Sequence, residues 1–205
     1  RGDQRQKLRA GGIETVEQLA GAPSPPEGLP SATFERLRAQ ARLQWEQSQR
    51  EDGRVLYELT ETAAQNLGRL PKPSEGDLFF DFEGDPLFVD PSGVPGQLEY
   101  LWGVLRASGE FTPLWAHDAA QEKEALEGFL DLVQERLAAH PDMHVYHYAP
   151  YEISALKRLV AQHQTREETL DALLRQGVFV DLYKTVRGAV RVGQPSYSIK
   201  KLEPL

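Results

Sequence analysis

Residues 78–85, Leu-Phe-Phe-Asp-Phe-Glu-Gly-Asp, place two acids inside a run that otherwise has the composition of a buried β-strand. Because strand side chains alternate, Asp81 and Glu83 share one face, and the phenylalanines on either side of Asp81 point to the other. The two carboxylates are then roughly 6 to 7 Å apart, a spacing that suits one or two divalent cations. The alternative is a strand end whose acids simply reach solvent, since Gly-Asp-Pro interrupts the strand directly afterwards.

The composition is that of an ordinary globular protein. The 205 residues are 40% hydrophobic and 26% charged, which is enough for one α/β domain plus an appendage. The net charge of −8 repels a polyanion, so any contact with nucleic acid must be local. No cysteine is present, which excludes disulfides and thiolate metal sites and fits a cytoplasmic location.

Two further expectations concern the whole chain. No apolar run approaches the 18 residues of a membrane span, so no membrane partner is expected. The sequence starts without Met and stops abruptly after Leu205, and we therefore expect it to be a piece of a longer protein.

The first 72 residues are predicted to be mainly helical. Residues 4–22 have the pattern of a helical hairpin capped by Thr15, and they resemble a helix-hairpin-helix unit, whose Gly-rich turn can present NH groups to a phosphate. A purely structural hairpin is the alternative. An amphipathic helix over 31–50 and one strand over 54–60 follow. A Pro-containing stretch at 70–73 marks the boundary of this region, which spans 1–72.

The remaining residues, 76–205, are predicted to form an RNase H-like α/β domain. Strands are expected at 77–83, 98–107, 110–116, 143–148 and 178–186, and helices at 119–139, 152–163 and 166–175. Three strands with short links indicate an antiparallel meander, and the later alternation of strand and helix indicates parallel pairing. An antiparallel meander followed by parallel strands, flanked by helices, is the order of an RNase H-like mixed sheet.

Two more acids follow later strands. Glu152 begins a helix after the strand that contains His147, where it can approach Asp81 and Glu83, although the helix dipole alone would favour an acid there. His147 is either a packed histidine or a substrate contact. Asp181 stands in an apolar strand, and it is either a site residue or a residue that fixes a loop by hydrogen bonds.

The segment 184–201 contains five basic residues and no acid. In a protein of net negative charge this segment is the local candidate for phosphate contacts, and Tyr197 within it can stack on a base. A solvated basic loop is the competing interpretation.

Taken together, Asp81-Phe82-Glu83, Tyr148-x-x-Tyr151-Glu152, Val180-Asp181-Leu182-Tyr183 and the segment 197–202 resemble the DEDD exonucleases of the RNase H-like superfamily. The set looks most like the YprB-type domain of bacterial proteins that join a RecB-family nuclease to a superfamily 1 helicase. The resemblance covers residues 76–205, and the preceding hairpin also looks like a segment of those proteins.

The resemblance implies a metal-dependent 3′-to-5′ exonuclease in DNA processing, acting on a single-stranded DNA or RNA end and linked covalently to nuclease and helicase domains. Asp81 and Glu83 match the first motif, and Glu152 stands where the second motif has Asp. Asp181 matches a recurrent Asp, whereas the family's last metal-binding Asp lies in a later helix.

In that implied mechanism Asp81, Glu83 and Glu152 hold two Mg²⁺ or Mn²⁺ ions, and Asp181 completes the catalytic set. The implied nucleic-acid contacts are His147, Tyr151, Lys184, Arg187, Tyr197, Lys200 and Lys201. Two alternatives remain open. One is a catalytically inactive RNase H-like module that binds nucleic acid or acts as a spacer, which the Asp-to-Glu change at Glu152 would permit. The weaker one is a metal-dependent phosphatase, whose usual D-x-D-x-T pattern is not present.

Overall fold

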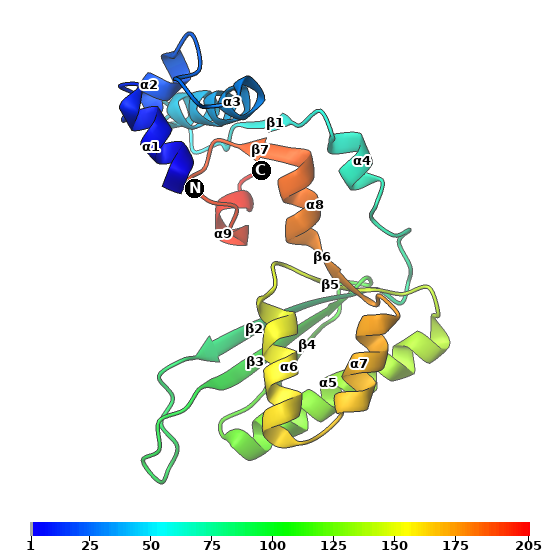
Figure 1. Ribbon diagram of the computed structural model, residues 1–205. Coiled ribbons are helices and arrows are strands. Elements are labelled where there is room, and N and C mark those ends of the chain that lie inside the picture. Colours follow the sequence, from blue (N-terminus) through cyan, green and yellow to red (C-terminus); the bar gives the residue numbers. More distant parts are fainter. Residues whose placement is uncertain (1) are drawn as a thin grey trace. The chain divides into compact units, whose positions relative to one another are not determined.

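The computed structural model describes residues 2–205 and shows two compact units (Figure 1). One unit consists of the chain up to Leu67 together with Val186–Leu205, and the other is Gly68–Thr185. The boundary predicted at 70–73 lies close to the junction between Leu67 and Gly68. The last twenty residues group with the first unit, whereas the sequence placed them with the α/β domain.

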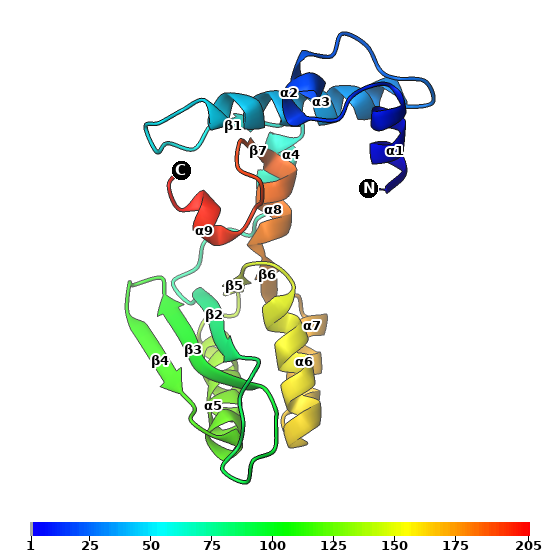
Figure 2. The same ribbon diagram turned by 90° about the vertical axis from the view of Figure 1, so that its left-hand side faces the viewer.

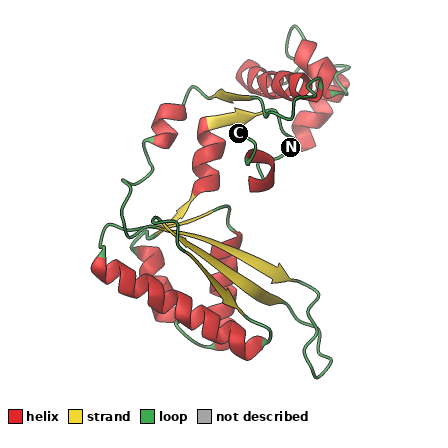
Figure 3. Cartoon of the chain, turned by 180° about the vertical axis from the view of Figure 1, so that it is seen from behind, coloured by secondary structure: helices red, strands yellow, loops and turns green. Residues whose placement is uncertain are grey.

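The second unit contains a five-stranded mixed sheet, whose strands are drawn in yellow in Figure 3. Its strands are β2 (Leu78–Asp85), β3 (Leu98–Arg106), β4 (Phe111–Trp115), β5 (Val145–His147) and β6 (Phe179–Asp181). The order across the sheet is β4-β3-β2-β5-β6. β2 pairs antiparallel with β3 and β3 with β4, whereas β5 runs parallel to both β2 and β6. The predicted antiparallel meander followed by parallel strands is therefore confirmed, with β2 at the centre.

Three helices cover the hydrophobic face of this sheet: α5 (Ala119–Ala139), α6 (Tyr151–His163) and α7 (Glu167–Arg175). Asp118 caps α5 by accepting a hydrogen bond from the Gln121 backbone NH at 2.9 Å. Phe80 of β2 stacks on Phe129 of α5, with ring centroids 4.0 Å apart. Burial alternates along β2 as the sequence predicted. Asp81 lies on the exposed face of the strand, and Phe80 and Phe82 on either side of it are buried in the core.

The sequence predicted the wrong end for the last strand of the sheet. The sequence predicted strand over 178–186, but β6 stops at Asp181 and α8 (Leu182–Ala189) begins directly after it. The Asp181 side chain accepts a hydrogen bond from the Tyr183 backbone NH at 3.0 Å, which satisfies a donor in the first turn of the helix. The apolar, β-branched composition of this stretch concealed that cap.

The first unit is built on helices and one small sheet. Its elements are α1 (Gly2–Ala10), α2 (Val16–Gly21), α3 (Ser31–Ser48), β1 (Tyr57–Leu59), α4 (Ala63–Leu67), β7 (Val190–Val192) and α9 (Ile199–Leu202). β1 and β7 pair antiparallel, which ties the chain's last residues to this unit. The predicted hairpin is confirmed, because the Thr15 hydroxyl accepts from the Gln18 NH in a capping box.

The Gly-rich turn between α1 and α2 uses its own NH groups. The backbone NH groups of Gly11, Gly12 and Ile13 donate to carbonyls in the last turn of α1. Gly12 has a φ of 78°, a value that glycine adopts readily. Because these NH groups are already used inside the turn, the contacts support the interpretation of the hairpin as a purely structural unit. In the part of the chain that the structure describes, no helix has the length and apolar character to cross a membrane.

The Phe80–Phe129 stack gives a direct test of this fold. Phe129 is fully buried, so we expect Phe129→Ala to lower the free energy of unfolding by about 3 to 5 kcal/mol. Phe111→Ala removes the same ring from a site that is 56% exposed and should cost less than about 1 kcal/mol. Urea denaturation followed by circular dichroism measures both; equal losses would contradict the assignment of the core.

Candidate functional site

Asp81 and Glu83 both lie on the exposed face of β2. In the antiparallel register Asp81 is opposite Gly103 and Glu83 is opposite Leu101, so no charged residue faces either carboxylate from β3. Gly103 contributes no side chain beside Asp81. The expectation that the two acids share one face is therefore confirmed, and their strand lies at the centre of the sheet.

Glu152 is in a different environment. It lies in the first turn of α6, is only 3% exposed, and its Oε2 is 3.4 Å from Nδ1 of His147. That oxygen has no hydrogen-bond donor among the described residues. His147 itself is buried, and its Nδ1 lies 2.8 Å from the Ala149 carbonyl oxygen. A buried carboxylate oxygen without a donor is uncommon and costs about 1 to 3 kcal/mol, so Glu152 is suited to a cation.

The register of the parallel strands separates the predicted acids. Leu78 pairs with Val145 in the core, and His147 pairs with Asp181, so the latter two belong to the helix-covered face. Asp81 and Glu83 point to the opposite face. Within residues 2–205 no three His, Asp or Glu side chains are grouped as a metal site. The structure thus brings together Asp81 with Glu83 and, separately, His147 with Glu152.

Asp181 holds the loop that leads into α6. Its Oδ1 accepts from the backbone NH groups of Ala149 and Tyr183, both at 3.0 Å, and its Oδ2 is 3.7 Å from Nζ of Lys184. Ala149 has a φ of 74°, a conformation that is rare for residues other than glycine. Of the two interpretations of Asp181, these contacts support the one in which it fixes a loop.

A network around a buried carboxylate, which the sequence did not reveal, joins α6 to the start of β3 beside the end of β2. The Tyr151 hydroxyl donates to Oε1 of Glu99 at 2.8 Å, and Arg158 forms an ion pair with the same carboxylate. Glu99 is fully buried beside Gly84, where an added Cβ would clash with its Oε2. Burial raises the pKa of Glu99, and burial and the Glu99 carboxylate together raise the pKa of Tyr151 to about 12.

This network uses the polar end of Tyr151, a residue predicted to contact nucleic acid. Because its pKa is so high, the hydroxyl stays protonated at neutral pH and remains a donor to Glu99. It therefore positions the helix start that bears Glu152. The available sequence signal was an acid at position 99 within the apolar strand, which requires a buried partner.

The basic residues of the later segment lie on α8, α9 and the connection between them. Lys184, Arg187, Lys200 and Lys201 are exposed. The Tyr197 hydroxyl donates to the Val190 carbonyl at 3.1 Å, and the Arg187 guanidinium carbon is 5.8 Å from the centre of the Tyr197 ring.

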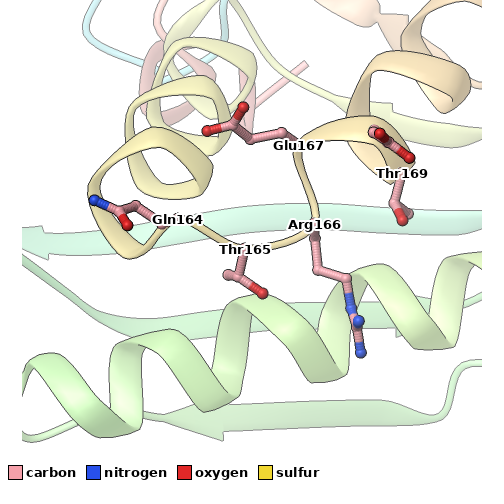
Figure 4. A pocket seen from close by; sticks show the side chains of 6 residues that line it. Gln164, Thr165, Arg166, Glu167 and Thr169 are labelled. Atoms are coloured by element: carbon pink, nitrogen blue, oxygen red, sulfur yellow. The ribbon is translucent and has the colours of Figure 1, made fainter.

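A hollow of about 460 Å³ at the turn between α6 and α7 contains none of the predicted site residues (Figure 4). Gln164 and Arg166 both have positive φ there. Thr165 donates to Glu127, and Arg166 pairs with Asp131 at 2.8 Å, so these two polar side chains hold the turn to α5.

A family model described as the RNase H superfamily matches residues 78–205, which is more than half of the chain. The match starts at the first residue of β2 and includes all five strands of the large sheet. Among curated proteins there is no match, and no solved structure matches the chain.

The unsatisfied oxygen of Glu152 predicts an unusual effect on stability. We expect Glu152→Gln to raise the free energy of unfolding by about 1 kcal/mol in the presence of a chelator, because it removes a buried charge with an incomplete set of donors. Urea denaturation provides the measurement.

Glu122→Gln is the matched control. Glu122 is equally buried, but its oxygens accept from the Glu99 NH at 2.7 Å and contact Nε2 of His163 at 2.8 Å. We expect this variant to lose about 1 to 3 kcal/mol. Similar losses in both variants would show that Glu152 is satisfied in the folded protein.

Proposed function

Because the chain belongs to the RNase H superfamily, we propose that it is a metal-dependent nuclease domain that hydrolyses phosphodiester bonds of DNA or RNA as a 3′-to-5′ exonuclease. The observation that carries the proposal is the Asp81–Glu83 pair on the exposed face of the central strand. Two carboxylates on one side of a strand, roughly 6 to 7 Å apart, suit one or two divalent cations.

Mg²⁺ or Mn²⁺ fits the available donors, because carboxylate oxygens are the ligands that these hard cations prefer. Asp81, Glu83 and Glu152 would hold the metal, and a pair of such ions activates a water and stabilises the leaving oxygen. Glu152 has an oxygen without a hydrogen-bond donor in the described chain, which is consistent with this role.

The chain's own residues shape the surroundings of the site. Gly103, opposite Asp81 on β3, brings no side chain or charge of its own to the acids, and the Phe111 ring lies against this glycine. The Tyr151–Glu99 hydrogen bond fixes the first turn of α6, and with it the backbone of Glu152, to the start of β3, which pairs with the end of β2. Positioning of this kind supports catalysis because reacting groups must be held close to their productive geometry.

Substrate contacts are proposed at the predicted basic and aromatic residues. The protein carries a net charge of −8, so a strand must be attracted locally, and Lys184, Arg187, Lys200 and Lys201 present exposed cations for its phosphates. We propose that Tyr151 and Tyr197 contact the strand through their rings, whereas the His147 ring is buried and supports the start of α6 from within. We also propose that the domain works within a larger cytoplasmic nuclease-helicase, which would supply the strand end.

A catalytically silent nucleic-acid-binding module is the second candidate. It is favoured by the longer side chain of Glu in place of Asp at position 152, whose Oε2 lies 3.4 Å from Nδ1 of the buried His147. The two candidates differ in whether the β2 acids bind metal and whether cleavage depends on them.

Isosteric variants of the β2 acids test the proposal. We expect Asp81→Asn and Glu83→Gln each to abolish measurable Mn²⁺ binding by calorimetry and to slow degradation of end-labelled single-stranded DNA by roughly 100-fold or more. Both residues are exposed, so the folded state should be unaffected.

Asp90→Asn is the control for loss of one acidic group. The Asp90 carboxylate accepts hydrogen bonds from Ser92 and from the Val94 NH within a loop, so its loss should leave metal binding and cleavage unchanged. Cleavage that is equal in the wild type and the Asp81 variant would rule out the nuclease proposal. Mn²⁺ binding without any cleavage would favour the silent module.

A further inference from the structure

The first unit contains a pocket of about 470 Å³ with a concentration of positive charge. Three arginines line it: Arg36 from α3, Arg187 from the end of α8, and Arg191 from β7. β7 contacts α3 directly, and both elements are visible in Figures 1 and 2. No Asp or Glu is among the described residues that line the pocket, although acids outnumber bases in the whole chain. We call this site the arginine pocket.

Ionic and hydrogen-bonding contacts hold the arginine pocket in shape. Nη1 of Arg191 lies 3.0 Å from Oε2 of Glu58, and Nη2 of Arg42 lies 2.9 Å from the other oxygen of the same carboxylate. The Glu58 carboxylate thus fixes the Arg191 guanidinium at the wall of the pocket, and Arg42 is paired a second time with Glu46 at 3.7 Å. Gln40, which also lines the pocket, donates to the Val192 carbonyl at 2.8 Å and holds α3 against β7.

The backbone at the junction of α8 and β7 is equally fixed. The Gly188 carbonyl accepts from the Thr60 hydroxyl at 2.6 Å and from the Asn66 amide at 3.1 Å. A side chain at Gly188 would collide with Asn66. Arg187 and Arg191 therefore emerge from a backbone that is anchored to the turn after β1, and little ordering is needed when a ligand binds.

Three guanidinium groups converge on one pocket, where an anion with several acceptor oxygens could accept hydrogen bonds from them. Arginine is well suited to phosphate because its planar fork donates two parallel hydrogen bonds. Leu37, Val190 and the Tyr197 ring add apolar surface to the wall, which matches the sugar and base of a nucleotide better than an isolated inorganic ion.

A neighbouring hollow shares the three arginines but also contains Glu35 and Glu61. Glu35 is 3.6 Å from Arg38 on the same helix, and Glu61 adds a further negative charge. The side of the site that contains Gln40 and Tyr197, where no acid is present among the described lining residues, is therefore the part suited to a phosphate.

We propose that the arginine pocket binds a backbone phosphate of a single-stranded nucleic acid. All of its lining residues belong to the first unit, so this site is separate from the acids on β2. It adds Arg36 and Arg191 to the predicted nucleic-acid contacts, and binding there does not require cleavage.

The test measures binding of a 5′-labelled oligothymidylate to the full chain by fluorescence anisotropy, with a chelator present so that metal-dependent chemistry is absent. We expect Arg36→Gln and Arg187→Gln each to weaken binding about 5- to 10-fold and to reduce the slope of log K against log salt by about 1. Arg36 is an exposed residue of α3, so its replacement should not affect folding.

Arg38→Gln is the matched control, because it removes an arginine two positions along the same helix that does not line the pocket. We expect its affinity to stay within about twofold of the wild type. Equal affinities for the Arg36, Arg187 and Arg38 variants would overturn the proposal.

Competition separates the sources of phosphate. Inorganic phosphate and a mononucleotide should displace the oligonucleotide only at far higher concentration than unlabelled oligonucleotide does. If either small anion competes as well as the oligonucleotide, the assignment to a strand is wrong. Because the assay contains a chelator and does not depend on cleavage, failure of this site is distinguished from failure of the proposed nuclease site.

Discussion

The packing of β2 on α5 is the constraint on which the second unit depends. Phe80 stacks on Phe129, and Phe82 makes an edge contact with Trp102, with ring centroids 4.5 Å apart. Once these rings are buried, the two-residue period of the strand leaves Asp81 no orientation except toward the opposite face. A shift of one residue in the register of β2 would bury Asp81 and Glu83 and expose Phe80 and Phe82. The core therefore determines where the acids point, without any direct contact with them.

The second constraint acts at the end of the same strand. A bulge between Glu83 and Gly84 interrupts the register, and the glycine leaves the space that the Glu99 carboxylate occupies. Glu99 then accepts from Tyr151, the residue directly before Glu152. The start of α6 is thus held by a buried charge with several donors, which is costly to form alone and is stabilised by the Arg158 ion pair. A fixed helix start next to the acidic strand is the arrangement that a site divided between two elements needs.

Much of this architecture could be predicted from the sequence, because its signals are local. Three signals act within a few positions: the alternation of side chains along β2, the recurrence of apolar residues every three or four positions in α5, and the capping residue Thr15. The end of β6 was missed because Asp181 caps the next helix, and a cap is hard to separate from a strand residue in an apolar stretch. The role of Glu99 could not be read at all, since its partners are more than 50 positions away. The sequence also could not show that Glu152 is buried beside His147, because that depends on how the start of α6 packs.

The two buried glutamates of the second unit show how stability and function separate. Glu122 joins β3 to α6 through the Glu99 NH and His163, so both of its oxygens serve the fold. Glu152 has the same burial but keeps an oxygen that has no donor in the described chain, and its one close basic neighbour is His147. A buried carboxylate oxygen without a donor lowers stability, and the helix dipole at the first turn of α6 offsets only part of that cost. Its presence is accounted for if the charge acts on something that the fold alone does not contain, and a bound cation is the partner that its chemistry fits.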